Sequence, residues 1–90
     1  MLNNSILRGD KMTKVIFRKD KKTGEVLAFF PETYKGGTLM CYAHNGQHST
    51  TELSYYWTTI KANPLEYEGL AKELIEFYDY QLEIKQRLVR

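Results

Sequence analysis

The sequence predicts a single small α+β domain. We expect a four-stranded, largely antiparallel sheet, in the order β-β-β-α-α-β, with two helices packed on one face. The chain has only 90 residues, the size of one domain with one core. Its first half shows the alternation typical of strands, and its second half contains a segment with helical spacing. Hydrophobic residues make up 42% of the chain and aromatic residues 13%, which excludes an intrinsically disordered composition.

The N-terminal stretch differs from the rest of the chain. Residues 1–11 are polar and follow neither a helical nor a strand period, so we expect a disordered leader before a domain that spans residues 12–90. The longest apolar run, residues 26–30, is far too short to cross a membrane. Cys41 is the only cysteine, which excludes an internal disulfide and indicates a reducing compartment. The expected location is therefore cytoplasmic.

The first half of the domain is predicted to contain three strands. Residues 14–19 and 25–30 are rich in β-forming side chains, and the five-residue loop between them ends in Gly24, which can adopt positive φ. The second of these strands is apolar on both faces and is therefore expected to be central. Pro31 is expected to end it, because proline has no N–H to donate to a strand ladder. Residues 38–44 are predicted to form the third strand.

Residues 49–60 give conflicting signals. Their threonine and aromatic side chains favour a strand, but the apolar residues recur at helical spacing. Ser49 and Glu52 also have the spacing of a capping box, which satisfies free N–H groups at a helix start. We interpret the segment as a short helix, with a strand as the alternative.

The following helix has clearer signals. Asn63 is predicted as its N-cap, Pro64 as its first residue and Glu66 as the third, which gives a second capping box. Residues 81–88 then alternate as a fourth strand with one solvated face. The buried stripe of the helix is predicted to be Tyr67, Leu70, Ala71, Leu74, Ile75 and Tyr78, and the inward residues of the last strand Leu82, Ile84 and Leu88.

Charge is distributed unevenly although the net charge is only +2. Residues 1–22 hold seven basic residues and two acidic ones, whereas residues 64–79 hold five acidic residues and one basic residue. A basic hairpin could contact phosphates, and the alternative is a solvated hairpin with no partner. The candidate phosphate or nucleic-acid contacts are Lys14, Arg18, Lys19, Lys21 and Lys22.

The densest group of chemically useful side chains lies in the middle of the chain. Tyr42, His44, Gln47 and His48 combine a stacking ring, two imidazoles and an amide, which suits a nucleotide, a base or the backbone of a partner. The alternative is that Gln47 and His48 only hold their loop and cap the next helix. Cys41 and His44 are three residues apart on a predicted strand and so face opposite sides, which argues against a shared metal or a Cys-His nucleophile. No catalytic residue, metal site or cofactor is predicted.

Four segments, residues 15–19, 27–31, 41–49 and 63–67, together resemble a known family. That family consists of small uncharacterised proteins encoded on bacterial phages, plasmids and integrative elements. Its members share an Ile-Phe-Arg-Lys start, an aliphatic-Phe-Pro strand, a Tyr-x-His-x-Gly-Gln-His segment and a Pro-Glu-Glu-Tyr helix opening. The chain departs from it at residues 77–80, where it has Phe-Tyr-Asp-Tyr in place of Ile-Gly-Tyr. The resemblance implies a mobile-element context and no established activity.

We therefore expect a non-enzymatic binding module of a phage or other mobile element, which contacts a host protein or sequesters a small ligand such as a nucleotide. Two alternatives are an accessory protein that binds nucleic acid through its basic hairpin and a metal-dependent enzyme. A small sheet has two edges that can pair with another chain. A homodimer formed through an edge strand is the expected assembly.

Overall fold

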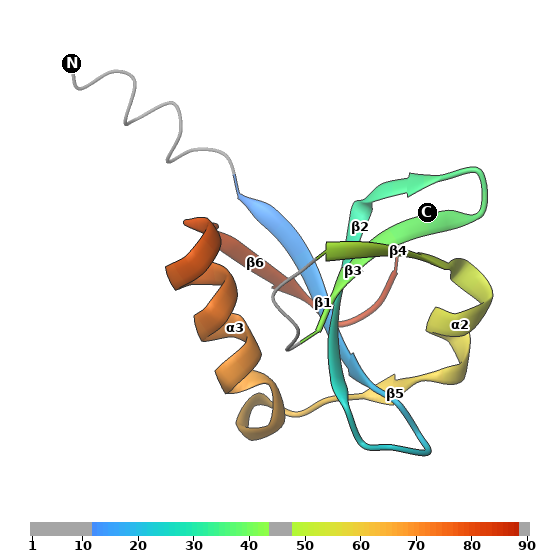
Figure 1. Ribbon diagram of the computed structural model, residues 1–90, viewed down its shortest axis with the longest axis horizontal. Coiled ribbons are helices and arrows are strands. Elements are labelled where there is room, and N and C mark those ends of the chain that lie inside the picture. Colours follow the sequence, from blue (N-terminus) through green and yellow to red (C-terminus); the bar gives the residue numbers. More distant parts are fainter. Residues whose placement is uncertain (1–11, 44–47, 89–90) are drawn as a thin grey trace.

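The computed structural model describes residues 12–43 and 48–88 (Figure 1). The leader expected at residues 1–11 lies outside the described residues. No helix of the described part is long and apolar enough to span a membrane. The elements are β1 (Thr13–Lys19), β2 (Val26–Lys35), β3 (Thr38–Tyr42), β4 (His48–Glu52), α2 (Leu53–Thr58), β5 (Ile60–Lys61), α3 (Pro64–Tyr78) and β6 (Leu82–Lys85).

The strands form one six-stranded sheet, which confirms the α+β class but not the expected number of four strands. Its order is β4-β3-β2-β1-β5, and β6 also pairs with β1. The short β5 lies antiparallel to the end of β1, at Arg18 and Lys19. By contrast, β6 runs parallel to the first part of β1, from Thr13 to Ile16. Two different segments therefore share the outer edge of β1, and all other pairings are antiparallel.

The hairpin between β1 and β2 forms as the sequence predicts. Gly24 has a φ of 77°, and its N–H donates to the Asp20 carbonyl at 2.9 Å. The Asp20 carboxylate accepts hydrogen bonds from the N–H groups of Lys22 and Thr23 and from the hydroxyl of Tyr55. These bonds, led by the one from Tyr55, lower the pKa of Asp20.

Pro31 does not end β2, contrary to expectation. The strand continues to Lys35, with an irregular register against β3 between Phe30 and Lys35. The Thr33 hydroxyl takes over part of the ladder here, because it accepts from the Met40 N–H at 2.8 Å and donates to the Phe30 carbonyl. A side chain thus joins the two strands where the backbone ladder is interrupted.

The interpretation of residues 49–60 as one helix is wrong for the first part of the segment. His48–Glu52 is a strand, paired over five residues with β3. Ser49 lies opposite Cys41 in this ladder and caps no helix. The predicted helical spacing is realised only in the six-residue α2, which buries Tyr56 and leaves Trp57 56% exposed.

The start of α3 confirms the predicted cap. The side chain of Asn63 accepts from the Glu66 N–H at 2.9 Å, and the Glu66 carboxylate accepts from the Asn63 N–H at 2.9 Å. Glu66 also forms an ion pair with Lys19, which joins the start of the helix to the end of β1. Leu70 and Leu74 are fully buried as predicted. Ile75, expected in the same stripe, is 49% exposed.

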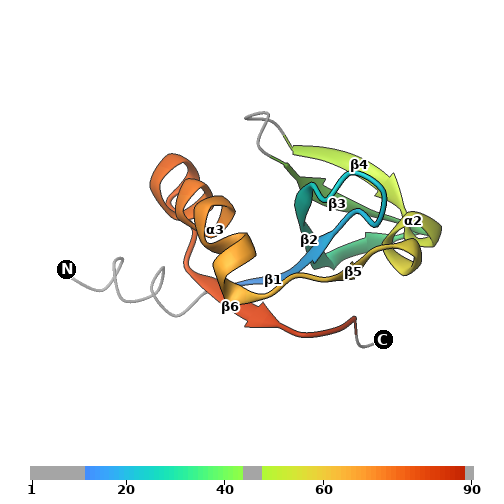
Figure 2. The same ribbon diagram turned by 90° about the horizontal axis from the view of Figure 1, so that it is seen from below.

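The two helices do not share a face of the sheet, and this part of the predicted architecture is wrong. One core packs α3 against Val15, Phe17, Ala28, Phe30 and Tyr42, and the other packs α2 against Ile16, Leu27, Phe29, Leu39 and Cys41. Figures 1 and 2 both show α3 and α2 on opposite sides of the strands. The reason is that β1 and β2 are apolar on both faces, so each face needs its own cover.

The C-terminal segment contributes to both cores instead of forming one long alternating strand. Leu82 packs on the α3 side, but Leu88 packs on the α2 side, where its N–H donates to the Tyr56 hydroxyl at 3.1 Å. Ile84, expected inward, is 40% exposed. β6 ends at Lys85, and the chain then changes faces before Leu88.

Candidate functional site

Of the four residues predicted to bind a ligand, the structure describes two. Tyr42 and His48 are direct partners in the ladder between β3 and β4, so their side chains lie together on the α3 face of the sheet. His44 and Gln47 lie outside the described residues. The described part of the predicted site is therefore a Tyr-His pair at one end of the two strands.

The His48 ring lies among four aromatic rings, which together with it we call the aromatic cluster. Its centroid is 4.8 Å from that of Tyr78, 5.1 Å from Tyr42, 5.4 Å from Phe30 and 5.9 Å from Tyr80. The contact with Tyr78 is edge to face, a favourable geometry for aromatic pairs. Strands β2, β3 and β4 supply three members, and the last turn of α3 with the residues after it supplies the other two.

Two hydroxyl groups give the aromatic cluster its polar contacts. The Tyr80 hydroxyl lies 3.1 Å from His48 Nε2, and the Tyr42 hydroxyl donates to Glu73 Oε1 at 2.9 Å. Tyr42 is fully buried, so its bond to Glu73 on α3 satisfies a group that would otherwise be costly to bury. The cluster is thus fixed by both ring packing and hydrogen bonds.

Burial shifts the pKa values of His48, Tyr42 and Tyr80 in the direction that favours their neutral forms. Desolvation lowers the pKa of His48 below its usual 6.5. Desolvation, with a smaller contribution from the hydrogen bond to Glu73, raises the pKa of Tyr42 to about 12. Desolvation also raises the pKa of Tyr80. A neutral imidazole and neutral phenols can each both donate and accept a hydrogen bond.

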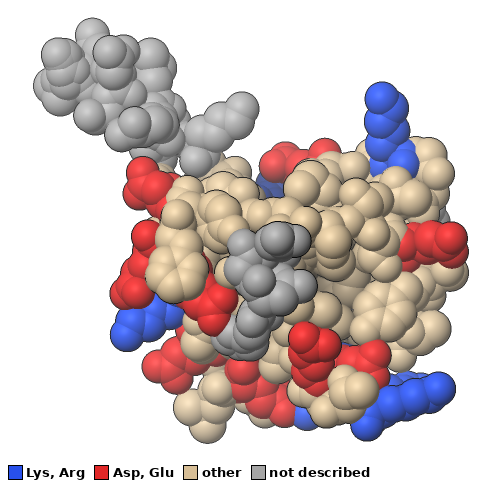
Figure 3. Space-filling model, viewed as in Figure 1, with Lys and Arg blue, Asp and Glu red and all other residues tan. Residues whose placement is uncertain are grey.

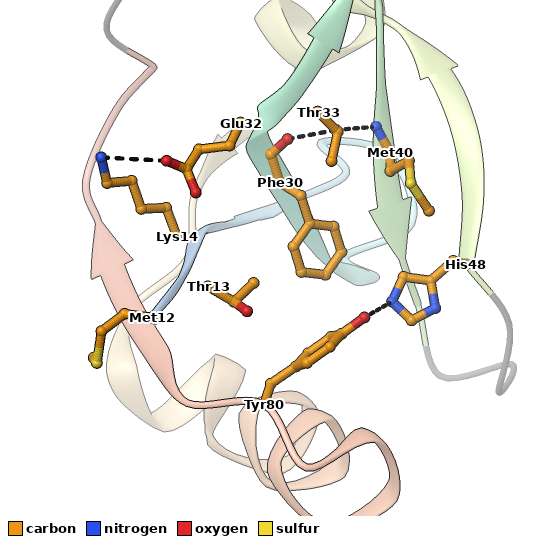
Figure 4. Close-up of a pocket in the computed structure, with 9 residues that line it drawn as sticks. All are labelled: Met12, Thr13, Lys14, Phe30, Glu32, Thr33, Met40, His48 and Tyr80. Atoms are coloured by element: carbon orange, nitrogen blue, oxygen red, sulfur yellow. Dashed lines mark hydrogen bonds and ion pairs between the residues drawn. The ribbon is translucent and has the colours of Figure 1, made fainter. Parts of the chain in front are cut away.

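A pocket of about 190 Å³ opens beside the cluster (Figure 4). Phe30, His48 and Tyr80 form one side, and the figure shows the Phe30 ring pointing into the space. The side chain of Met40 adds an apolar wall from β3. The remaining lining residues are Met12, Thr13, Lys14, Glu32 and Thr33.

The rim of the pocket carries its charged groups. Lys14 Nζ lies 3.5 Å from Glu32 Oε2, and the two side chains are 41% and 61% exposed. Such an exposed pair contributes little stability, so Lys14 can exchange its partner for an anion at small cost. The pocket therefore combines an apolar interior, one polar edge and an exposed ion pair at the entrance.

Sequence reasoning did not find most of the pocket. In the sequence, Phe30 stands out only as the end of an apolar strand, and Tyr80 only as one of the residues that depart from the resembled family. Residues 77–80 do contain three aromatic residues in four positions, which was the available signal. Met40 is two residues before Tyr42 on the predicted third strand and therefore shares its face. Glu32 carried no signal, because the single sequence does not show that it lies beside His48.

Cys41 takes no part in this site. It is buried in the core on the α2 side, and its Sγ lies 3.5 Å from Ser49 Oγ. His48 lies on the other face, so the two side chains cannot bind one metal ion. Among the residues that the structure describes, no group of three His, Cys, Asp or Glu side chains could hold a metal.

The candidate phosphate contacts are dispersed over the hairpin. Arg18 binds the Thr59 carbonyl and hydroxyl with its guanidinium 4.9 Å from the centre of the Tyr56 ring, so it serves packing on the α2 side. Lys19 points to the other face and pairs with Glu66, and Lys14 pairs with Glu32. Lys21 and Lys22 are exposed in the turn. The structure thus does not bring the five basic residues together on one surface.

Acidification is expected to destabilise the protein through His48. Because the pKa of folded His48 is lowered, the unfolded chain binds a proton more readily. The contribution of neutral His48 to the free energy of unfolding is thus complete above about pH 6.5. It is lost as the pH falls toward the lowered pKa of folded His48. Urea unfolding between about pH 8 and pH 5 should show a steeper loss of stability for the wild type than for His48→Gln.

The difference between these two proteins isolates His48, since His44 is present in both. Asp20 and Glu66, whose pKa values are lowered, stabilise the fold above the usual carboxyl range and lose that effect only below about pH 4.5. Equal slopes for the wild type and His48→Gln would show that His48 titrates alike in the folded and unfolded chains.

Comparisons with protein-family models, with curated proteins and with solved structures found no match for this chain.

Proposed function

We propose that the protein is a non-enzymatic binding module whose pocket holds a small flat group such as the base of a nucleotide. The observation that carries this proposal is the apolar pocket bounded by Phe30 and Met40 with the His48-Tyr80 pair at its edge. Aromatic and thioether walls suit a ring, and a neutral imidazole with a phenol supplies both a donor and an acceptor.

The size of the pocket limits what it can enclose. Its volume of about 190 Å³ is below the roughly 300–1,000 Å³ of sites that surround a drug-sized molecule. A single base fits this space better than a whole nucleotide, so the sugar and phosphate would extend toward the rim. The position of Lys14 at the rim would let it contact a phosphate after leaving Glu32. The resemblance to proteins of mobile elements suggests that such a ligand belongs to the host cell.

The proposal is tested by titrating the protein with nucleosides and nucleoside monophosphates and following amide shifts by NMR. Shifts are expected around the pocket, and the affinity should fall about tenfold in Tyr80→Phe, which removes one half-buried hydrogen-bonding group. Tyr34→Phe, the same change on an exposed tyrosine outside the pocket lining, is the matched control.

A second pair of variants tests the role of the rim. Lys14→Met should weaken binding of the monophosphate but not of the nucleoside, whereas Lys35→Met, at the exposed end of β2, should affect neither. Shifts confined to other surfaces, or none with any base, would overturn the proposal. In that case a macromolecular partner would be sought by cross-linking through the same face.

A further inference from the structure

The outer side of α3 carries an apolar and charged stripe that the fold leaves uncovered. Leu65 is 86% exposed and Ile75 is 49% exposed, although both are large aliphatic residues. Glu68 and Lys72 lie between them and are also exposed. The four residues follow the spacing i, i+3, i+7 and i+10, so they lie along one side of the helix. A shallow groove runs beside this stripe, lined in part by Leu65, Lys72 and Ile75.

The order of residues in this stripe is self-complementary. Leu65 and Ile75 are equally distant from residue 70, and so are Glu68 and Lys72. If a second α3 lies antiparallel to the first with a twofold axis at residue 70, Leu65 meets Ile75 of the other copy. In the same register, each Glu68 meets Lys72 of the other copy. The spacing of the four residues is that of the a and d positions of a heptad. In an antiparallel helix pair, each a position lies opposite a d position of the other helix, as it does here.

We propose that α3 is the interface of a homodimer in which two copies of this helix pack antiparallel. Every contact then occurs twice, as a twofold interface requires. The two outer contacts bury aliphatic side chains, and the two inner contacts pair opposite charges. This surface differs from the edge strands at which the sequence suggested that copies would meet.

The remaining charges of the helix agree with an antiparallel arrangement. Figure 3 shows acidic side chains gathered over the α3 side of the molecule. In the antiparallel register, the exposed Glu76 of each copy lies near Pro64, at the partner's helix start. Backbone N–H groups at a helix start attract a carboxylate. A parallel pair would instead align these acidic residues with one another, so charge selects the antiparallel orientation.

The predicted dimer is weak and depends on concentration. α3 has 15 residues and is therefore roughly 22 Å long. One pair of such helices buries less than the roughly 1,200 Å² of stable complexes. Sedimentation velocity should accordingly show a shift from monomer to dimer between about 10 µM and 1 mM protein.

The decisive experiment uses two charge-reversal variants, each measured alone and then in an equimolar mixture with the other. Glu68→Lys alone and Lys72→Glu alone each place like charges in both inner contacts, so each should weaken self-association about tenfold or more. In an equimolar mixture of the two variants, each inner contact of a mixed dimer again pairs opposite charges. Association of the mixture should return to within about threefold of the wild type.

The mixture distinguishes a lost contact between copies from a defect within one helix. Each chain in the mixture still carries its substitution, so mixing can restore only contacts between chains. The control mixture combines Lys35→Glu with Glu25→Lys, two exposed residues away from α3 that carry the same changes of charge. That mixture should associate like the wild type, and far-UV circular dichroism should show all variants folded. A wild type that stays monomeric at 1 mM, or single variants that associate undiminished, would overturn the proposal.

Discussion

Replacing Tyr56 by alanine is expected to lower the free energy of unfolding by about 3–5 kcal/mol, the usual cost of removing a buried aromatic side chain. Tyr56 is 1% exposed and packs edge to face on Phe29 with ring centroids 5.1 Å apart. Its hydroxyl accepts the Leu88 N–H, and the Arg18 guanidinium lies over its ring. The substitution therefore leaves a cavity and releases the C-terminal segment that covers the α2 side. Urea unfolding followed by fluorescence measures the loss.

The adjacent residue provides the matched control. Trp57 is the larger side chain but is 56% exposed, so Trp57→Ala should cost less than about 1.5 kcal/mol, monitored by circular dichroism because the tryptophan is lost. Tyr56→Phe keeps the ring and removes only the hydrogen bond to Leu88, with an expected cost of about 1 kcal/mol. A larger loss for Trp57→Ala than for Tyr56→Ala would mean that α2 turns its other side to the sheet.

Signals that act within a few residues were sufficient to predict several elements. The capping box at Asn63 and Glu66 and the positive φ of Gly24 depend on contacts between near neighbours, and both appear as predicted. The apolar run from Val26 to Phe30 indicated a strand buried on both faces, which the two cores confirm. The same run already implied a cover on each face, so the placement of both helices on one face contradicted that pattern.

The elements that were missed depend on distant partners. His48–Glu52 is polar and carries a capping-box pattern, yet it forms a strand because five residues of β3 pair with it. The two-residue β5 exists only because β1 offers an open edge. The strand or helix propensity of a short segment does not reveal which distant strand will pair with it. Where helix and strand are both weakly favoured, the tertiary contacts decide between them.

The site was predicted in the same partial way. Tyr42 and His48 were grouped because they are close in the sequence, and the ladder between β3 and β4 does place them side by side. Phe30 and Tyr80 join them only through folding, from β2 and from the residues after α3. The lowered pKa of His48 is also a consequence of this packing, because burial among the aromatic rings disfavours the charged imidazolium.

Leu74→Ala is expected to destabilise the protein by about 2–5 kcal/mol, because it removes a fully buried side chain from the other core. Leu74 lies between α3 and the face of the sheet that carries Val15 and Ala28. Loss of its contacts weakens the attachment of the whole helix, including the aromatic residues that follow it. The measurement is urea unfolding by circular dichroism in dilute protein, so that association of copies does not contribute.

Leu65→Ala makes the same chemical change on the same helix and is the matched control. Leu65 is 86% exposed in the single copy, so its truncation should alter the stability of the dilute protein by no more than about 0.5 kcal/mol. The same variant should weaken self-association, because there Leu65 meets Ile75 of the second copy. One leucine would thus affect chiefly the folding of the domain and the other chiefly its assembly. Equal destabilisation by the two substitutions in dilute protein would contradict the orientation of α3, and with it the uncovered stripe.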